Sequence, residues 1–401
     1  MITRRQAILW CSVALTGSAA ESTDGSGGRV HLLRTPEGGL QPQATVEDSG
    51  ILHVAYYSGE AHQGNLHYAR SVDGGASFSS AIRVNSQPGS AIATGTIRGA
   101  QIAIGGAGRV HIAWNGSGQA EPNGPLNPDS GKLGAPMLYS RLNEGGDAFE
   151  PQRNVMHHSF GLDGGGSIAA DRSGNVYVAW HGIGEFEAKG TGQEGEARRE
   201  VWIAKSQDAG ASFPAERKAW QRPTGACGCC GMKIFADSRG NVAALYRSAT
   251  ESVHRDIYLM TSTDQGRKFQ GTLLHKWDVN ACPMSSMDIA GNGKILAGAW
   301  ETGGQVYWAR LDCEGHSASE PVAAPGDGKG RKHPRLAVNQ NGEILLVWTE
   351  GTGWQKGGSL AWQMYDPSGR PTAIRGQQLG IPTWSFAAAI ARKDNGFSIL
   401  Y

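Results

Sequence analysis

The stretch Gly174-Asn-Val-Tyr-Val-Ala-Trp180 is a glycine turn followed by an apolar, β-branched run that ends in an aromatic residue. Such a run, bounded by a turn residue, is typical of a buried β-strand. The same phrase returns at spacings of roughly 50–65 residues, the range expected for propeller blades. Its seven copies occupy residues 49–56, 108–114, 174–180, 240–246, 293–300, 342–348 and 396–401.

Short strands flank these copies on both sides. A short apolar run precedes most of them, as in residues 101–104, 167–170 and 335–338, and a third run follows, as in residues 66–70, 201–205 and 257–261. The repeating unit is therefore a small antiparallel sheet, and the fold class is all-β.

A second signature, Ser-x-Asp-x-Gly-x-x-Phe, follows the third strand in three of the repeats. The Asp side chain can accept bonds from the backbone of its own turn, the Gly takes a positive φ, and the Phe packs into the sheet. We therefore expect a structural rather than catalytic role for the three aspartates, which are Asp73, Asp208 and Asp264.

This signature resembles the Asp-box, or BNR, repeat of the sialidase-like β-propellers, and the repeats cover nearly the whole chain after residue 20. The resemblance implies a propeller of four-stranded blades, typically six, in a family that includes exo-sialidases. Six units are complete here, and residues 385–401 supply two strands of a seventh. We expect six, or seven, blades in a single domain over residues 21–401, with the ring closed by strands from both ends of the chain, the first at residues 30–34.

The chain begins with the features of a signal peptide. Arg4 and Arg5 precede a short apolar run over residues 7–16, and small residues follow in Ser18-Ala-Ala20. We predict that residues 1–20 direct export, by a Sec or twin-arginine route, to the periplasm or the extracellular space. The net charge of +1 over 401 residues gives no reason to expect nucleic acid as a partner, and no segment after the signal is long and apolar enough for membrane insertion. We expect a monomer.

Two neighbouring repeats carry unusual chemistry in the loops that lead into their innermost strands, here called lead loops. One reads Thr224-Gly-Ala-Cys-Gly-Cys-Cys-Gly-Met232, and the next reads Asn280-Ala-Cys-Pro-Met284. Propeller geometry places both at the same mouth of the central channel. Soft sulfur ligands favour Cu(I), with zinc second. The predicted metal ligands are Cys227, Cys229, Cys230 and Cys282, with Met284 and His254 as auxiliaries.

Two other interpretations of these cysteines stay open. In an exported protein, Cys282 can instead form a disulfide with one of the three clustered cysteines. A thiolate nucleophile is the remaining alternative. The leading hypothesis is copper binding in a binding or redox role.

The alternative function is glycan-directed: an exo-sialidase-type hydrolase, or a non-catalytic glycan-binding propeller with structural disulfides. The resemblance implies an arginine cluster that holds a substrate carboxylate. The family's Arg-Ile-Pro motif is absent, because the corresponding stretch reads Gly39-Leu-Gln-Pro-Gln-Ala-Thr45. The candidate catalytic residues on the channel face are Arg98, Asp163, Arg199, Arg247 and Arg335.

Overall fold

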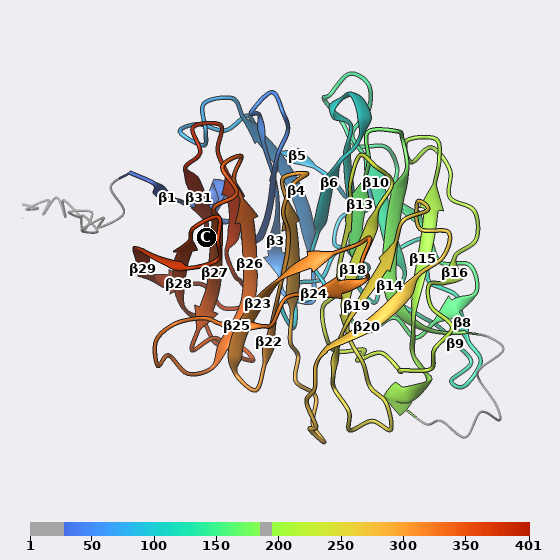
Figure 1. The fold of residues 1–401 in the computed structure, drawn as a ribbon. Coiled ribbons are helices and arrows are strands. Elements are labelled where there is room, and N and C mark those ends of the chain that lie inside the picture. Colours follow the sequence, from blue (N-terminus) through green and yellow to red (C-terminus); the bar gives the residue numbers. More distant parts are fainter. Residues whose placement is uncertain (1–27, 185–194) are drawn as a thin grey trace, which may run out of the picture.

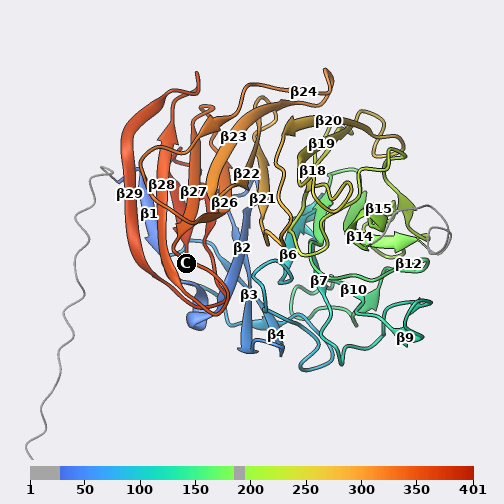
Figure 2. The ribbon, with the colours of Figure 1, turned by 90° about the horizontal axis from the view of Figure 1, so that it is seen from below.

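Each repeat forms one small twisted sheet, and seven such sheets stand around a central channel as the blades of a β-propeller (Figures 1 and 2). Six of them are antiparallel, and the seventh also contains one parallel strand pair. The computed structural model describes residues 28–184 and 195–401. The predicted signal peptide, residues 1–20, lies outside these ranges. Within them, no helix is long and apolar enough to cross a bilayer.

The first four blades each contain four strands in chain order from the channel outward, and the third has an additional short strand, β12 (Ser159–Phe160), paired with its second strand. Blade 1 consists of β2 (Leu40–Val46), β3 (Leu52–Glu60), β4 (Gln63–Ser71) and β5 (Ile82–Arg83). Blade 2 consists of β6 (Gln101–Ile104), β7 (Val110–Asn115), β10 (Met137–Arg141) and β11 (Arg153–Asn154). Blade 3 consists of β13 (Ser167–Ala170), β14 (Val176–Gly184), β15 (Glu200–Ser206) and β16 (Arg217–Lys218). Blade 4 consists of β17 (Lys233–Ala236), β18 (Val242–Arg247), β19 (Ile257–Ser262) and β20 (Gln270–His275).

The last three blades follow the same plan. Blade 5 consists of β21 (Met287–Gly291), β22 (Leu296–Thr302) and β23 (Gln305–Asp312), with β24 (Ser317–Ala318) and β25 (Val322–Ala323) at its edge. Blade 6 consists of β26 (Arg331–Val338), β27 (Ile344–Glu350), β28 (Gly358–Tyr365) and β29 (Pro371–Ile381). Blade 7 consists of β30 (Ala388–Ala391), β31 (Phe397–Leu400) and β1 (Val30–Leu33).

The remaining elements are short. They are the strands β8 (Leu126–Asn127), β9 (Lys132–Leu133) and β12 (Ser159–Phe160), and the 3₁₀ turns η1 (Pro36–Gly38), η2 (Gly106–Gly108) and η4 (Gly195–Arg198).

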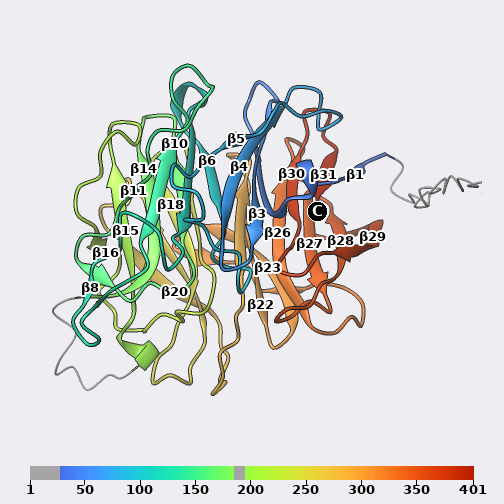
Figure 3. The same ribbon diagram turned by 180° about the vertical axis from the view of Figure 1, so that it is seen from behind.

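Blade 7 closes the ring by joining the two ends of the described chain. β1 pairs in parallel with β31, from Val30 opposite Phe397 to Leu33 opposite Leu400. Figure 3 shows β1 beside β31, close to the C-terminus. The predicted closure by strands from both ends is confirmed, and the ring has seven blades rather than the six of the family norm.

The hydrophobic core is divided into seven clusters, one at each contact between neighbouring blades. The cluster between blades 3 and 4 contains Tyr177 and Tyr246, and the cluster between blades 7 and 1 contains Ile390 and Tyr56. The strand-ending tryptophans Trp114, Trp180, Trp300 and Trp348 are all buried in these contacts. Each blade therefore depends on both neighbours for the burial of its apolar faces.

The Asp-box aspartates fasten the turns after the third strands. Asp73 Oδ1 accepts bonds from the Ser71 hydroxyl (2.7 Å) and from the Ser77 backbone N–H (2.9 Å). Asp208 and Asp264 make the corresponding bonds in blades 3 and 4. The side chain replaces backbone partners that a turn of this shape leaves unsatisfied.

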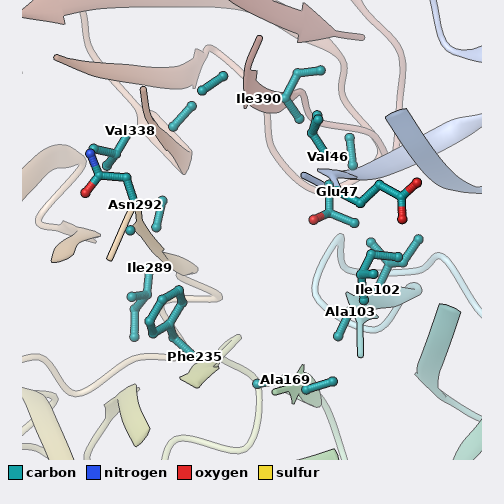
Figure 4. A pocket seen from close by; sticks show the side chains of 18 of the residues that line it. Val46, Glu47, Ile102, Ala103, Ala169, Phe235, Ile289, Asn292, Val338 and Ile390 are labelled. Atoms are coloured by element: carbon teal, nitrogen blue, oxygen red, sulfur yellow. The ribbon is translucent and has the colours of Figure 1, made fainter. Parts of the chain in front are cut away.

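The central channel is lined by the innermost strands of all seven blades and encloses about 1090 Å³. Figure 4 shows Ile102, Ala169, Ile289, Val338 and Ile390 around the opening. These residues come from five different blades. The lining combines these apolar side chains with polar and charged ones, such as Glu47, Asp288 and Asn292.

The closure strand generates a first prediction. Replacing buried Val30 with Asn removes apolar contacts and leaves an unpaired amide in the core between blades 6 and 7. We expect a loss of about 2–4 kcal/mol in the free energy of unfolding, measured by chemical denaturation. His31→Asn, at the exposed next position of β1, is the matched control and should stay within about 0.5 kcal/mol of wild type. Equal effects of the two substitutions would contradict the closing role of β1.

Candidate functional site

The lead loop of blade 4, residues 224–232, is enclosed by the loops around it. Its own blade supplies the Arg247 carbonyl, which accepts a bond from Cys227 N–H (2.9 Å). The next blade supplies the Ser285 carbonyl, which accepts a bond from Gly231 N–H (2.8 Å). In the preceding blade, Gly164 N–H donates to the Gly228 carbonyl (2.9 Å). The loop is thereby held between three blades, at the mouth of the channel.

Glycines allow this close packing. A Cβ atom at Gly165, which has a positive φ of 66°, would lie 2.3 Å from the Cys230 carbonyl oxygen. A Cβ atom at Gly228 would lie 2.5 Å from Nε of Arg199. Neither position has room for a side chain, so the thiol-bearing segment lies directly against its neighbours.

The predicted gathering of cysteines is present, but their sulfur atoms are in two chemical states. Cys229 and Cys282 form a disulfide between the lead loops of blades 4 and 5, with their Cα atoms 6.5 Å apart. Cys227 and Cys230 are free, buried thiols. The disulfide alternative is therefore confirmed for Cys229 and Cys282.

The free thiols remain close to the disulfide. Cys227 Sγ lies 3.5 Å from Cys229 Sγ, and the sulfur atoms of Cys227, Cys229 and Cys230 all lie within 4.8 Å of one another. Within residues 28–184 and 195–401, this is the one group of three or more His, Cys, Asp or Glu side chains with that spacing. The lead loop of blade 4 therefore places two buried thiols directly beside a disulfide whose other half, Cys282, is exposed.

The two free thiols differ in acidity. Burial of Cys230 opposes its ionisation, but the Cys227 thiol, the Arg247 guanidinium and the Ser285 hydroxyl outweigh burial and lower the pKa of Cys230 to about 7. The hydrogen bond with Cys230, together with burial, raises the pKa of Cys227. The pair therefore favours a state in which Cys227 keeps its proton and donates it toward a Cys230 thiolate.

Arg247 is a structural support for this state. Its guanidinium is fully buried, donates to the Ser285 hydroxyl (2.6 Å), and bonds the backbone carbonyls of Arg255 and Glu301. The Ser285 hydroxyl in turn lies 3.6 Å from Cys230 Sγ. Within residues 28–184 and 195–401 this guanidinium has no ion pair with a carboxylate, and its positive charge is fixed near the thiol, with Glu301 and Asp256 as the neighbouring acids.

Several buried polar atoms around the loop lack hydrogen-bond partners within the described part of the chain. They are both ring nitrogens of His181, Nε and one terminal nitrogen of Arg255, and Oε2 of Glu301. Burial, and then the charge of Arg199, lowers the pKa of His181 to about 3, so its imidazole is neutral. Burial raises the pKa of Glu301. A buried polar atom without a hydrogen-bond partner destabilises the folded state, so several of them beside one loop indicate a functional role for this region.

The two predicted auxiliary ligands are directed elsewhere. His254 Nδ1 lies 2.6 Å from Asp278 Oδ1 at the partly exposed rim. The Met284 methyl group approaches Gly95 in the lead loop of blade 2, 3.3 Å from the position of an added Cβ. Neither His254 nor another described imidazole joins the sulfur group.

The candidate catalytic residues lie on the same face but in separate pairs. Arg98 donates to Asp163 across blades 2 and 3 (2.5 Å). Arg199 pairs with Glu196 (3.1 Å). Arg247 lies beneath the cysteines, and Arg335 lines the channel. The structure brings Arg98 together with Asp163.

Sequence reasoning missed three residues of this region. Ser285 orients Arg247, and Gln43 and Asp288 line the channel. Gln43 and Asp288 could have been found from the sequence, because each is a polar residue in a predicted innermost strand. Side chains alternate between the two faces of a strand, so such a residue can point into the channel.

Comparisons with known proteins agree with the architecture. No protein-family model matches the sequence, and no curated protein matches it. The structure is similar to a protein of unknown function from Dyadobacter fermentans (TM-score 0.50, 14% identity), covering 88% of this chain and 97% of that one. It is similar to an ulvan lyase of polysaccharide lyase family 25 (TM-score 0.52, 14% identity), covering 88% and 87%. A mutant NanB sialidase from Streptococcus pneumoniae aligns with a TM-score of 0.47 at 11% identity, covering 94% of this chain and 66% of that one.

At these identities the likeness is one of fold. The propeller predicted from the Asp-box repeats is confirmed, and the chemistry of the site must be argued from its own residues.

The shared proton of the cysteine pair generates a second prediction. Cys227→Ala removes the thiol that stabilises the Cys230 thiolate, so the pKa of Cys230 should rise from about 7 toward its ordinary value. A pH titration of thiolate absorbance in the native protein should show the thiolate appearing only at higher pH. Cys313→Ala, which removes the other free cysteine, should leave the lower transition in place. An unchanged midpoint in the Cys227 variant would refute the pairing.

Proposed function

We propose that this protein is an exported β-propeller that binds a soft metal ion, Cu(I), through Cys227 and Cys230. The observation that carries the proposal is the pair of free, buried thiols in a Cys-x-x-Cys segment within the three-sulfur group. Thiolates select soft metals, and the lowered pKa of Cys230 supplies one thiolate near neutral pH.

The disulfide favours copper over zinc. With Cys229 and Cys282 joined, two cysteine thiols of the four remain as ligands. A structural zinc site normally needs four ligands, whereas Cu(I) accepts fewer soft ligands. In this interpretation the disulfide fixes the loop, and the proposal requires neither Met284 nor His254.

The setting supports a binding role. The thiols are buried and Cys282 is exposed, so the metal would be held just beneath the rim at the junction of two blades. The predicted signal peptide of residues 1–20 would deliver the domain, residues 21–401, to a compartment where disulfides persist. We propose that it acts there as a monomer.

A second candidate function, non-catalytic glycan binding, is favoured by an exposed aromatic side chain. Trp354 lies in the loop between β27 and β28 and is 57% exposed. Its ring packs edge-on against the ring of Trp384, which lies in the lead loop of blade 7, with the two ring centres 4.8 Å apart. An indole held in this way offers a rigid surface on which a sugar ring can stack. The ulvan lyase of similar fold was determined with a uronic acid-containing saccharide.

Copper binding is tested by titrating the purified, anaerobic protein with Cu(I) in competition with a chromophoric chelator. Wild type should bind one Cu(I) per chain, and Cys230→Ser should lose more than about 100-fold in affinity because half of the thiolate pair is removed. Cys313→Ser, which removes a free buried cysteine outside the sulfur group, should retain wild-type affinity.

Thiol counting on the same sample fixes the redox state. The denatured, non-reduced mature protein should show three free thiols, those of Cys227, Cys230 and Cys313. If wild type with this thiol count competes no better than Cys230→Ser, the copper proposal is wrong.

Glycan binding is tested by affinity electrophoresis through gels that contain ulvan or a neutral polysaccharide. Trp354→Ala should weaken retardation by roughly tenfold if the indole stacks on sugar. Leu379→Ala removes another exposed apolar side chain, from the outer strand β29, and should migrate like wild type. Retardation that is absent, or equal in all three proteins, would count against this second function.

A further inference from the structure

The disulfide between Cys229 and Cys282 lies beside a free thiol. Cys227 Sγ is 3.5 Å from Cys229 Sγ, so the two sulfur atoms are in contact. Cys229 is therefore bonded to one cysteine while a second cysteine touches the same sulfur atom. Copper binding through Cys227 and Cys230 does not require this contact, and neither does glycan binding at Trp354.

The backbone around Cys227 holds the contact in place. Cys230 N–H donates to the Cys227 carbonyl (3.1 Å), which closes a tight turn. Gly228 separates the two touching cysteines. Its N–H donates to the Glu196 carboxylate, and its carbonyl accepts a bond from Gly164 N–H (2.9 Å). The sulfur atoms of Cys227 and Cys229 thus belong to one fixed turn, which raises their effective concentration relative to each other.

The other half of the disulfide is free to move toward solvent. Cys282 is exposed in the lead loop of blade 5, whereas Cys229 is half-buried and Cys227 is buried. The lead loops of blades 4 and 5 are also joined by a bond from Gly231 N–H to the Ser285 carbonyl (2.8 Å). Release of Cys282 therefore leaves a second connection between the two loops.

We propose that Cys227 and the Cys229–Cys282 disulfide form a thiol–disulfide exchange site, which converts between two pairings of the same cysteines. The Cys227 sulfur attacks Cys229 Sγ, so that a Cys227–Cys229 bond forms while the Cys229–Cys282 bond breaks. Cys282 leaves with the bonding electron pair and takes up a proton from water at the exposed rim. The proton of Cys227 passes to the sulfur of Cys230, the acceptor in their hydrogen bond. One disulfide replaces another, so the step needs no external oxidant or reductant.

Cys230 is a poorer bonding partner for Cys229 than Cys227 is. Consecutive Cα atoms are about 3.8 Å apart across a trans peptide, whereas the Cα atoms of a disulfide are usually about 4.4–6.8 Å apart. A bridge between Cys229 and its neighbour Cys230 is therefore strained. A bridge between Cys227 and Cys229 has an intervening residue, Gly228, whose backbone can adjust.

The exchange changes which thiol faces solvent. In the pairing of the structure, the free cysteines Cys227, Cys230 and Cys313 are all buried. In the exchanged pairing, Cys282 is free at the rim, where it meets alkylating agents or small disulfides from solution. The inference goes beyond the copper proposal and requires no metal, although both use Cys227.

Alkylation of the native protein tests the inference. The protein is kept anaerobic with a metal chelator and treated with iodoacetamide, which traps an exposed thiol irreversibly. Wild type should slowly acquire the label at Cys282, and the labelled molecules should contain a Cys227–Cys229 disulfide. Mass spectrometry after digestion with pepsin maps both, and the acid needed for pepsin stops further exchange because thiols stay protonated. Mapping is required because either pairing leaves three free thiols.

Cys227→Ser removes the nucleophile with little change in size, and it should slow the labelling of Cys282 by at least about tenfold. The matched control is Cys313→Ser, which removes a buried free cysteine outside the sulfur group and should label like wild type. Near-UV circular dichroism verifies that each variant is folded. If Cys227→Ser does not fold, the disulfide mapped in labelled wild type decides the question.

Three results would each overturn the inference. They are a wild-type Cys282 that stays unlabelled, labelled molecules that lack the Cys227–Cys229 disulfide, and a folded Cys227→Ser variant that labels as fast as wild type. The experiment contains no copper, so a failure of the copper proposal would leave its outcome unchanged.

Discussion

The parallel pairing of β1 with β31 is the constraint on which the rest of the molecule depends. Without β1, blade 7 has two strands, and the clusters that it shares with blades 6 and 1 lose part of their cover. Because every blade buries its faces against two neighbours, an open ring would expose apolar surface at both ends. The channel and its mouth exist only in the closed ring. The approach of the blade 4 and blade 5 loops that carry the cysteines follows from the same geometry.

Much of this fold is predictable because its signals are local. A glycine turn before an apolar strand and an Asp-box after the third strand each act within one blade, as the bonds of Asp73 to Ser71 and Ser77 illustrate. The number of blades was harder to predict. Blade 7 is divided between residues 30–33 and 388–400, so its signal is incomplete at either end of the sequence. Six clear units and one fragment became seven blades through a pairing between distant segments.

The site was predictable in position and less so in detail. Neighbouring lead loops must meet at the channel mouth, so the proximity of Cys229 to Cys282 followed from the repeat pattern. Which cysteine forms the bridge depends on loop conformation, which glycines such as Gly165 and Gly228 set through contacts with other blades. His254 bonds Asp278, a partner outside any motif. Gln43 resembles a surface residue in the sequence, and the register of its strand places it in the channel lining, where the sequence candidate Arg335 also lies.

The direction of the closing strands also has a mechanical consequence. β1 and β31 run the same way, although one begins and the other ends the described chain. Tension applied between these two ends therefore acts along the strands in opposite directions. Such a load shears the whole register from Val30–Phe397 to Leu33–Leu400 at once, instead of peeling the bonds apart one after another. The ring is thus joined in the orientation that best resists being pulled open from its ends.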